Sequence, residues 1–187
     1  MIQTLGRLVV LENNIAISGF VSQKTVALLV YLVAHPGIHQ RDILAEMFWS
    51  DTTGKQALKN LRTVLSNLQK KVGAYLDVTR QTLEVINRDQ IQLDIHQFDT
   101  MLDAIDRGRK QPYSPRKQMN DIARAINLYH GEFLLAIKTD NAPELDTWIT
   151  LERERLRGRV VKALFQITET ALNNGYYEQG VSYGRRL

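Results

Sequence analysis

The sequence predicts a mainly α protein with a small β component, built in two parts. Apolar residues make up 44% and charged residues 24% of the 187 residues, which is ordinary globular composition. Short strand-like segments occur only before residue 94, and the apolar residues after it recur with helical spacing. The length suits one large or two small domains. We therefore expect one domain over 1–94 and an all-α domain over 95–187.

Several classes of protein are excluded at this stage. The chain has no cysteine, so it has no disulfide scaffold, thiolate zinc site or cysteine nucleophile. Its longest apolar run covers residues 26–34, far short of the roughly 20 residues that span a bilayer. The N-terminus lacks the basic and apolar regions of a signal peptide. We expect a cytoplasmic protein without a membrane partner.

The first elements are short. Residues 4–10 and 15–17 are expected to be strands, joined by a turn at 12–14. Ser22 is suited to cap a helix that runs to about Ala34 and ends at the following proline and glycine. A second, short helix is expected over 41–49. Its expected inward-facing residues are Ile43, Leu44, Met47 and Phe48.

The third helix, expected over 55–72, is the most regular. Its apolar residues recur at steps of three and four, which places Leu58, Leu61, Leu65, Leu68 and Val72 on one face. Gly73 is expected to end it. Residues 75–79 and 83–86 alternate like a hairpin, and 91–93 are a candidate strand. The order strand, strand, helix, helix, long helix, hairpin is that of a winged helix-turn-helix.

Only helices are expected in the second half. Residues 94–106 are amphipathic, and the polar, basic stretch 107–117 is expected to be mainly a loop. Further helices are expected over 118–129, over 144–173 and from 177 onward. A break near Gly158 stays open as an alternative to one continuous helix.

Basic residues gather in one part of a chain whose net charge is only +4. Residues 53–80 hold six basic residues against the single acid Asp77, whereas residues 1–52 are slightly acidic. A basic stripe on a near-neutral body indicates a surface that binds a polyanion. On the third helix the leucines occupy one side, and most of the polar residues lie opposite them or on the flank.

These polar residues suit the major groove of double-stranded DNA, which admits one α-helix. The residues expected to contact phosphates are Lys55, Lys59, Arg62 and Lys70. Those expected to contact base edges are Thr63, Ser66 and Asn67. Arg80, at the hairpin tip, is expected to reach a minor groove or a phosphate. The alternative is an ordinary solvated helix face.

No pattern calls for catalysis, a cofactor or a metal. His35 and His39 are separated by a proline and a glycine, and no third ligand stands at a suitable spacing. Trp49 and Trp148 lie among apolar neighbours and are expected to anchor the core. The alternating arginines at 153, 155, 157 and 159 favour ion pairs on one helix, with a second nucleic-acid patch as the alternative.

An ordered set of short motifs resembles the bacterial antibiotic-regulatory transcription factors. Those in the first half are Leu28-Leu29-x-Tyr31-Leu32, His35-Pro36-Gly37, Arg41-Asp42-x-Leu44, Phe48-Trp49-x-Asp51 and Ala57-x-x-Asn60-Leu61-Arg62. Those in the second half are Leu93-Asp94-x-x-x-Phe98, the segment 128–134, and Trp148 with the segment 152–156. Ser50 and Gln69 depart from the family pattern, which usually has proline and often arginine there. The second departure affects one phosphate or base contact that the family pattern implies.

The resemblance implies an OmpR-type winged helix followed by a bacterial transcriptional activator domain, a helical module of tetratricopeptide-like hairpins. It implies promoter binding, usually as a homodimer, and activation through RNA polymerase. Because a further tetratricopeptide-like unit begins near Tyr176, we also expect the chain to be part of a longer polypeptide.

Two other functions stay open. The first is a protein-interaction scaffold whose winged helix no longer binds DNA, recognisable by stable self-association without DNA binding. The second is an enzyme, which needs a concave pocket with convergent polar groups between the two halves.

Overall fold

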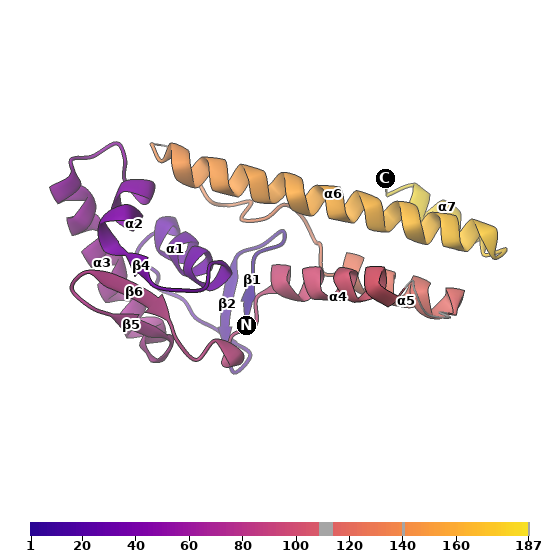
Figure 1. Cartoon of the computed structure of the whole chain (residues 1–187), viewed down its shortest axis with the longest axis horizontal. Coiled ribbons are helices and arrows are strands. Elements are labelled where there is room, and N and C mark those ends of the chain that lie inside the picture. Colours follow the sequence, from indigo (N-terminus) through magenta and orange to yellow (C-terminus); the bar gives the residue numbers. More distant parts are fainter. Residues whose placement is uncertain (109–113, 140, 187) are drawn as a thin grey trace.

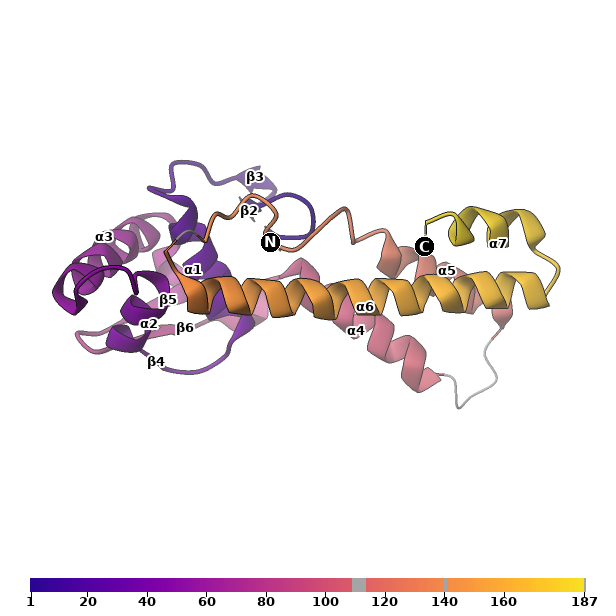
Figure 2. The same ribbon diagram turned by 90° about the horizontal axis from the view of Figure 1, so that it is seen from above.

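The computed structural model describes residues 1–108, 114–139 and 141–186. The fold is mainly α with two small sheets and forms an elongated molecule (Figure 1). One end holds both sheets and the first three helices, and the other end is helical (Figure 2). Among the described residues, none of the helices combines the length and apolar character required to cross a bilayer.

The first sheet is antiparallel and has the order β1-β2-β3. Its strands are β1 (Ile2–Gln3), β2 (Val9–Glu12) and β3 (Ile15–Ala16). The turn expected at 12–14 is confirmed, with Asn13 and Asn14 at φ values of 50° and 66°. The single strand expected over 4–10 is wrong: β1 ends at Gln3, and Gly6 takes the left-handed φ of 91°.

This interruption arises because residues 4–6 bond to the second half of the chain. The Leu134 N–H donates to the Thr4 carbonyl, and the Gly6 N–H donates to the Glu132 carbonyl. A Cβ atom on Gly6 would lie 2.8 Å from the backbone of His130, so the two backbones touch where only glycine fits. The N-terminal segment therefore forms part of the junction between the two halves.

The helices of the first half begin and end within one residue of the predicted positions. Helix α1 (Gln23–Ala34) begins at Ser22, whose hydroxyl accepts the Thr25 N–H. Helices α2 (Arg41–Phe48) and α3 (Gly54–Val72) pack against each other. Ile43 does not face inward as expected: its side chain is 61% exposed because α2 packs through the residues that follow it.

The second sheet is antiparallel with the order β4-β6-β5. Its strands are β4 (His39–Gln40), β5 (Leu76–Val78) and β6 (Thr82–Val85), so the expected hairpin is confirmed. A short 3-10 helix (Gly73–Tyr75) follows α3, and another covers Arg88–Gln90. The expected strand at 91–93 is wrong, since only Leu93 forms an isolated bridge, to Ile2.

Long helices make up the second half. They are α4 (Asp94–Gly108), α5 (Pro115–Ile126), α6 (Pro143–Asn173) and α7 (Tyr177–Gly184). Helix α5 begins and ends three residues earlier than expected, and α6 continues through Gly158 without a break. Residues 109–113 of the expected loop lie outside the described residues.

One apolar core runs through both halves. It includes Ile2 and Leu5 near the N-terminus, Phe98 of α4 and Phe133 before α6. Trp49 is buried, and the Trp148 ring packs edge-on against Phe133 at 5.5 Å, so both tryptophans anchor the core as expected. Helix α3 lies at the opposite end of the molecule from α7, clear of the long helices (Figures 1 and 2).

Candidate nucleic-acid interface

Helix α3 is positioned by its apolar side. The Thr53 hydroxyl caps its first turn by accepting the Gln56 N–H. Its buried residues are Ala57, Leu61, Val64, Leu65, Leu68 and Val72. Leu58 differs from the expectation, because its side chain is 37% exposed and faces the flank of the helix. The buried stripe is therefore centred farther round the helix than the leucines alone predict.

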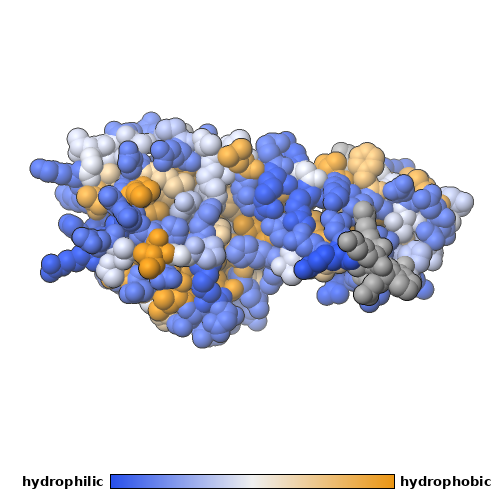
Figure 3. All heavy atoms as spheres, viewed as in Figure 1, coloured by the Kyte–Doolittle hydropathy of each residue, from blue (hydrophilic) through white to orange (hydrophobic). Residues whose placement is uncertain are grey.

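The opposite side of α3 is open to solvent. The exposed residues predicted for DNA contact are Lys55, Lys59, Arg62, Thr63, Ser66 and Lys70, and Asn67 is half-buried. Within the part of the chain that the structure describes, the four basic side chains form no salt bridge. Hydrophilic side chains project from this end of the molecule in Figure 3. This basic face therefore offers positive charge that its own fold does not neutralise.

The hairpin tip flanks α3 on the Leu58 side. Arg80 is exposed in the turn between β5 and β6, where the Thr79 hydroxyl accepts the N–H groups of Gln81 and Thr82. The Arg41 guanidinium donates a hydrogen bond to the Thr79 carbonyl at 2.9 Å. This bond holds the turn next to the start of α2. Leu58 and Arg80 line one depression between the helix and the hairpin. The structure thus brings Arg80 beside α3.

Asn67 has a different environment from the other predicted residues. Its side-chain oxygen accepts the Val21 N–H at 3.2 Å, and its side-chain nitrogen donates to the Gly19 carbonyl at 3.2 Å. The amide is therefore bonded at both ends to the loop before α1. Val21 and Arg41 carry no local sequence signal for this site, since both act through contacts that are distant in sequence.

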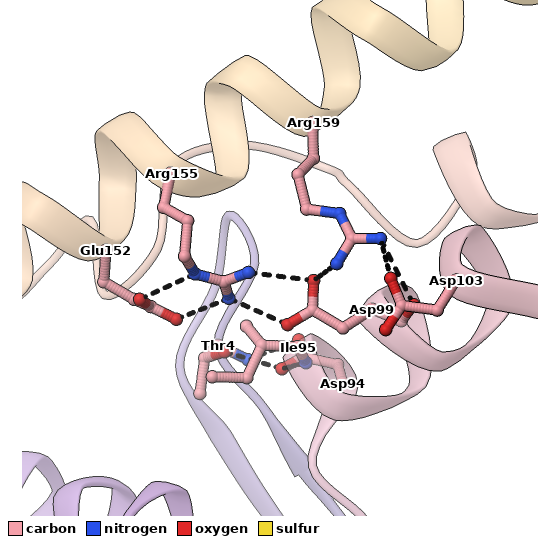
Figure 4. A network of polar contacts seen from close by, with 8 residues as sticks. All are labelled: Thr4, Asp94, Ile95, Asp99, Asp103, Glu152, Arg155 and Arg159. Atoms are coloured by element: carbon pink, nitrogen blue, oxygen red, sulfur yellow. Dashed lines mark hydrogen bonds and ion pairs between the residues drawn. The ribbon is translucent and has the colours of Figure 1, made fainter. Parts of the chain in front are cut away.

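The arginines of α6 are paired within the protein. Arg155 contacts both Glu152 and Asp99, and Arg159 contacts Asp99 and Asp103 of α4 (Figure 4). The hydrogen bond to Glu152, with a further contribution from Asp99, raises the pKa of Arg155 above its ordinary value. Arg153 and Arg157 both contact Glu132. The ion pairs expected for these arginines are thus present, although most of the partners lie outside α6.

The two histidines bond to the backbone. His35 Nδ1 lies 2.9 Å from the Tyr31 carbonyl oxygen, and His39 Nε2 lies 2.8 Å from the His35 carbonyl oxygen. Over residues 1–108, 114–139 and 141–186, no three histidine, aspartate or glutamate side chains are grouped so as to hold a metal ion.

Comparison with known proteins identifies the family. Residues 93–187 match the bacterial transcriptional activator domain, which is half of the chain. Among solved structures, the chain resembles Mycobacterium tuberculosis EmbR in complex with low affinity phosphopeptide, with a TM-score of 0.69 and 17% identity. That match covers 93% of this chain and 46% of the EmbR chain, so this chain spans less than half of that protein. At this identity the likeness shows a shared fold.

No curated protein sequence matches the chain. The family match falls on the segment where the sequence motifs 93–98, 128–134 and 152–156 lie, and it confirms the resemblance drawn from them. The chain belongs to the family of bacterial transcriptional regulators that carry a bacterial transcriptional activator domain.

Proposed function

We propose that this regulator binds double-stranded DNA through a winged helix-turn-helix over residues 1–94. In this proposal α2 and α3 form the helix-turn-helix, α3 enters the major groove, and the β5–β6 hairpin is the wing. The observation that carries the proposal is the basic face of α3, whose cations have no acidic partner among the described residues. Unpaired cations beside hydroxyl groups suit a phosphate backbone and base edges.

The contrast with α6 supports this assignment. Both helices carry five basic residues, yet the arginines of α6 at 153, 155, 157 and 159 are bonded to carboxylates. A cation that already pairs with a carboxylate must break that ion pair before it contacts a phosphate, which costs free energy. The cations of α3 have no such cost, so an external polyanion is their favoured partner.

Each residue of the basic face has a proposed role. Lys55, Lys59, Arg62 and Lys70 contact phosphates, and Thr63 and Ser66 reach base edges. Arg80, held beside α3 by the hairpin turn, contacts the minor groove or a phosphate of the flanking DNA. Asn67 contributes to specificity through the loop that it holds, because both ends of its amide are already bonded.

We assign the helical domain, residues 95–187, to dimerisation or to contact with RNA polymerase. We further propose that the protein activates transcription and that it acts in the cytoplasm. Exposed apolar side chains on the last two helices support a protein-binding role. They include Leu151 and Phe165 of α6 and Tyr177 and Val181 of α7, with exposures of 51% to 66%. A tetratricopeptide-like arrangement of these helices is part of the proposal.

The experiment that tests DNA binding is selection from a random DNA pool with residues 1–187, at two salt concentrations. We expect one enriched motif, bound less tightly at the higher salt concentration because phosphate contacts release counterions. Sedimentation of the complex then reports whether one or two copies bind each site. Recovery of no motif at either salt concentration would contradict the proposal.

A further inference from the structure

The loop between β3 and α1 is hydrogen-bonded to the C-terminal half of α3. Asn67 accepts the Val21 N–H and donates to the Gly19 carbonyl, each at 3.2 Å, across more than 45 residues of sequence. Gly19 has a φ of 78°, and a Cβ atom there would lie 3.0 Å from Lys71 Nζ. The backbone of this loop therefore lies close against α3 and is held in place by two bonds from one side chain.

The loop presents an apolar side chain at the edge of the basic face. Phe20 packs against the core, whereas the neighbouring Val21 side chain is 55% exposed. Val21 lines a shallow depression on the outer side of α3. The other residues lining it are Arg62, Thr63, Ser66, Asn67 and Lys70. Apart from Val21, all of these residues were predicted from the sequence to contact DNA.

Because Val21 is apolar, it can contact only an apolar group in the major groove of bound DNA without leaving a polar group unpaired. Most groups on the major-groove edges of bases are hydrogen-bond donors or acceptors, and a valine side chain satisfies none of them. The apolar group in that groove is the C5-methyl of thymine. Burying a valine methyl against it removes apolar surface from water without leaving a polar group unpaired.

We infer that Val21 is a specificity-determining residue that contacts the C5-methyl group of a thymine in the bound site. Asn67 is the positioning residue that holds Val21 there. The inference rests on the proposed DNA binding by α3 and adds a contact outside that helix. It also reassigns Asn67, since an asparagine that reads adenine needs both its oxygen and its nitrogen for the base.

The test uses the DNA motif selected with residues 1–187 and deoxyuridine, which lacks the thymine methyl group. Each thymine of the motif is replaced in turn, and affinity is measured for the wild type, Val21→Ala, Asn67→Ala and Ile15→Ala. Ile15 is the matched control, because its side chain is apolar, 73% exposed and outside the depression. Circular dichroism checks that each variant is folded.

We expect one replacement to weaken binding of the wild type and of Ile15→Ala by about fourfold, the ratio for one buried methyl or methylene group. The same replacement is expected to leave Val21→Ala and Asn67→Ala unaffected. Equal sensitivity of Val21→Ala and the wild type, or no sensitive thymine in the wild type, would overturn the inference and leave DNA binding standing. Failure to select any motif would overturn both.

Discussion

Thr4 and Asp94 form a buried contact that joins the N-terminal segment to the first residue of α4. The Thr4 N–H donates to Asp94 Oδ2 at 2.5 Å, and the Thr4 hydroxyl donates to Oδ1 at 2.6 Å. The same carboxylate accepts the N–H groups of Leu5 and Ile95. Asp94 is only 7% exposed, so one buried side chain holds the N-terminal segment at Thr4 and Leu5 against the start of α4.

Replacing Asp94 is expected to destabilise the whole fold. Asp94→Ala leaves three buried N–H groups without an acceptor, which predicts a loss of ~3 kcal/mol or more in the free energy of unfolding. Urea denaturation followed by circular dichroism measures it. Asp89→Ala is the control, because Asp89 is exposed in the short 3-10 helix and should change stability by less than ~0.5 kcal/mol. Equal stability of the two variants would refute the role of Asp94.

Two glycines are expected to respond to alanine in opposite directions. A Cβ atom on Gly131 would lie 2.9 Å from Gly6 Cα, so Gly131→Ala forces the backbones apart and should destabilise the protein by ~1–3 kcal/mol. Gly158 lies inside α6 with open space around it, so Gly158→Ala should stabilise by ~0.5–1 kcal/mol. Thermal unfolding of both variants gives the two signs. A stabilising Gly131→Ala would show that the segments separate readily.

The ion pairs between α4 and α6 are expected to give a stability that depends on salt. Asp99 contacts both Arg155 and Arg159, so Asp99→Asn should destabilise the protein by ~1–2 kcal/mol at low salt. The difference from wild type should shrink as sodium chloride is added, because the pairs are partly exposed. Arg124→Gln serves as the control, since Arg124 is 75% exposed and pairs with Asp121 at 3.9 Å. A difference that does not change with salt would argue against an electrostatic origin.

Removal of a side chain of α3 that contacts a base edge is expected to lower the discrimination between DNA sequences. Thr63→Ala removes a hydroxyl group from the basic face and should reduce discrimination at one base pair of the selected motif by ~1–3 kcal/mol. Affinity for unrelated DNA should stay the same, which competition binding measures. Thr100→Ala, on the exposed side of α4, is the matched control. A uniform loss over all sequences would assign Thr63 to backbone contact.

Local sequence signals predict most of the fold. The cap at Ser22, the turn residues at 12–14 and the spacing of leucines in α3 depend on neighbouring residues, and the structure has each element they predict. Contacts between distant segments could not be predicted in this way. The break at Gly6 arises from residues 130–134, and the exposure of Leu58 depends on where α2 and the hairpin pack.

In the candidate site, too, local sequence signals predict which residues are exposed, whereas contacts between distant segments could not be predicted. Helical periodicity places Lys59, Thr63 and Ser66 on the outer side of α3, and they are exposed there. Periodicity also groups Asn67 with them, yet it says nothing of the loop at 19–21 that occupies its amide. The partners of Arg159 lie on α4, so spacing along α6 alone could not identify them.

The salt dependence of DNA affinity measures most directly whether the cations of α3 contact phosphates. The affinity of the selected motif is measured from low to high salt for the wild type, Lys59→Ala and Lys162→Ala. Lys162 is the control because it already pairs with Asp106 on the helical half. We expect Lys59→Ala to lower the slope of log K against log salt by about 1 and to weaken all sequences equally, while Lys162→Ala matches the wild type. A wild-type slope for Lys59→Ala would contradict its phosphate contact, and a wild-type affinity independent of salt would contradict DNA binding through the basic face.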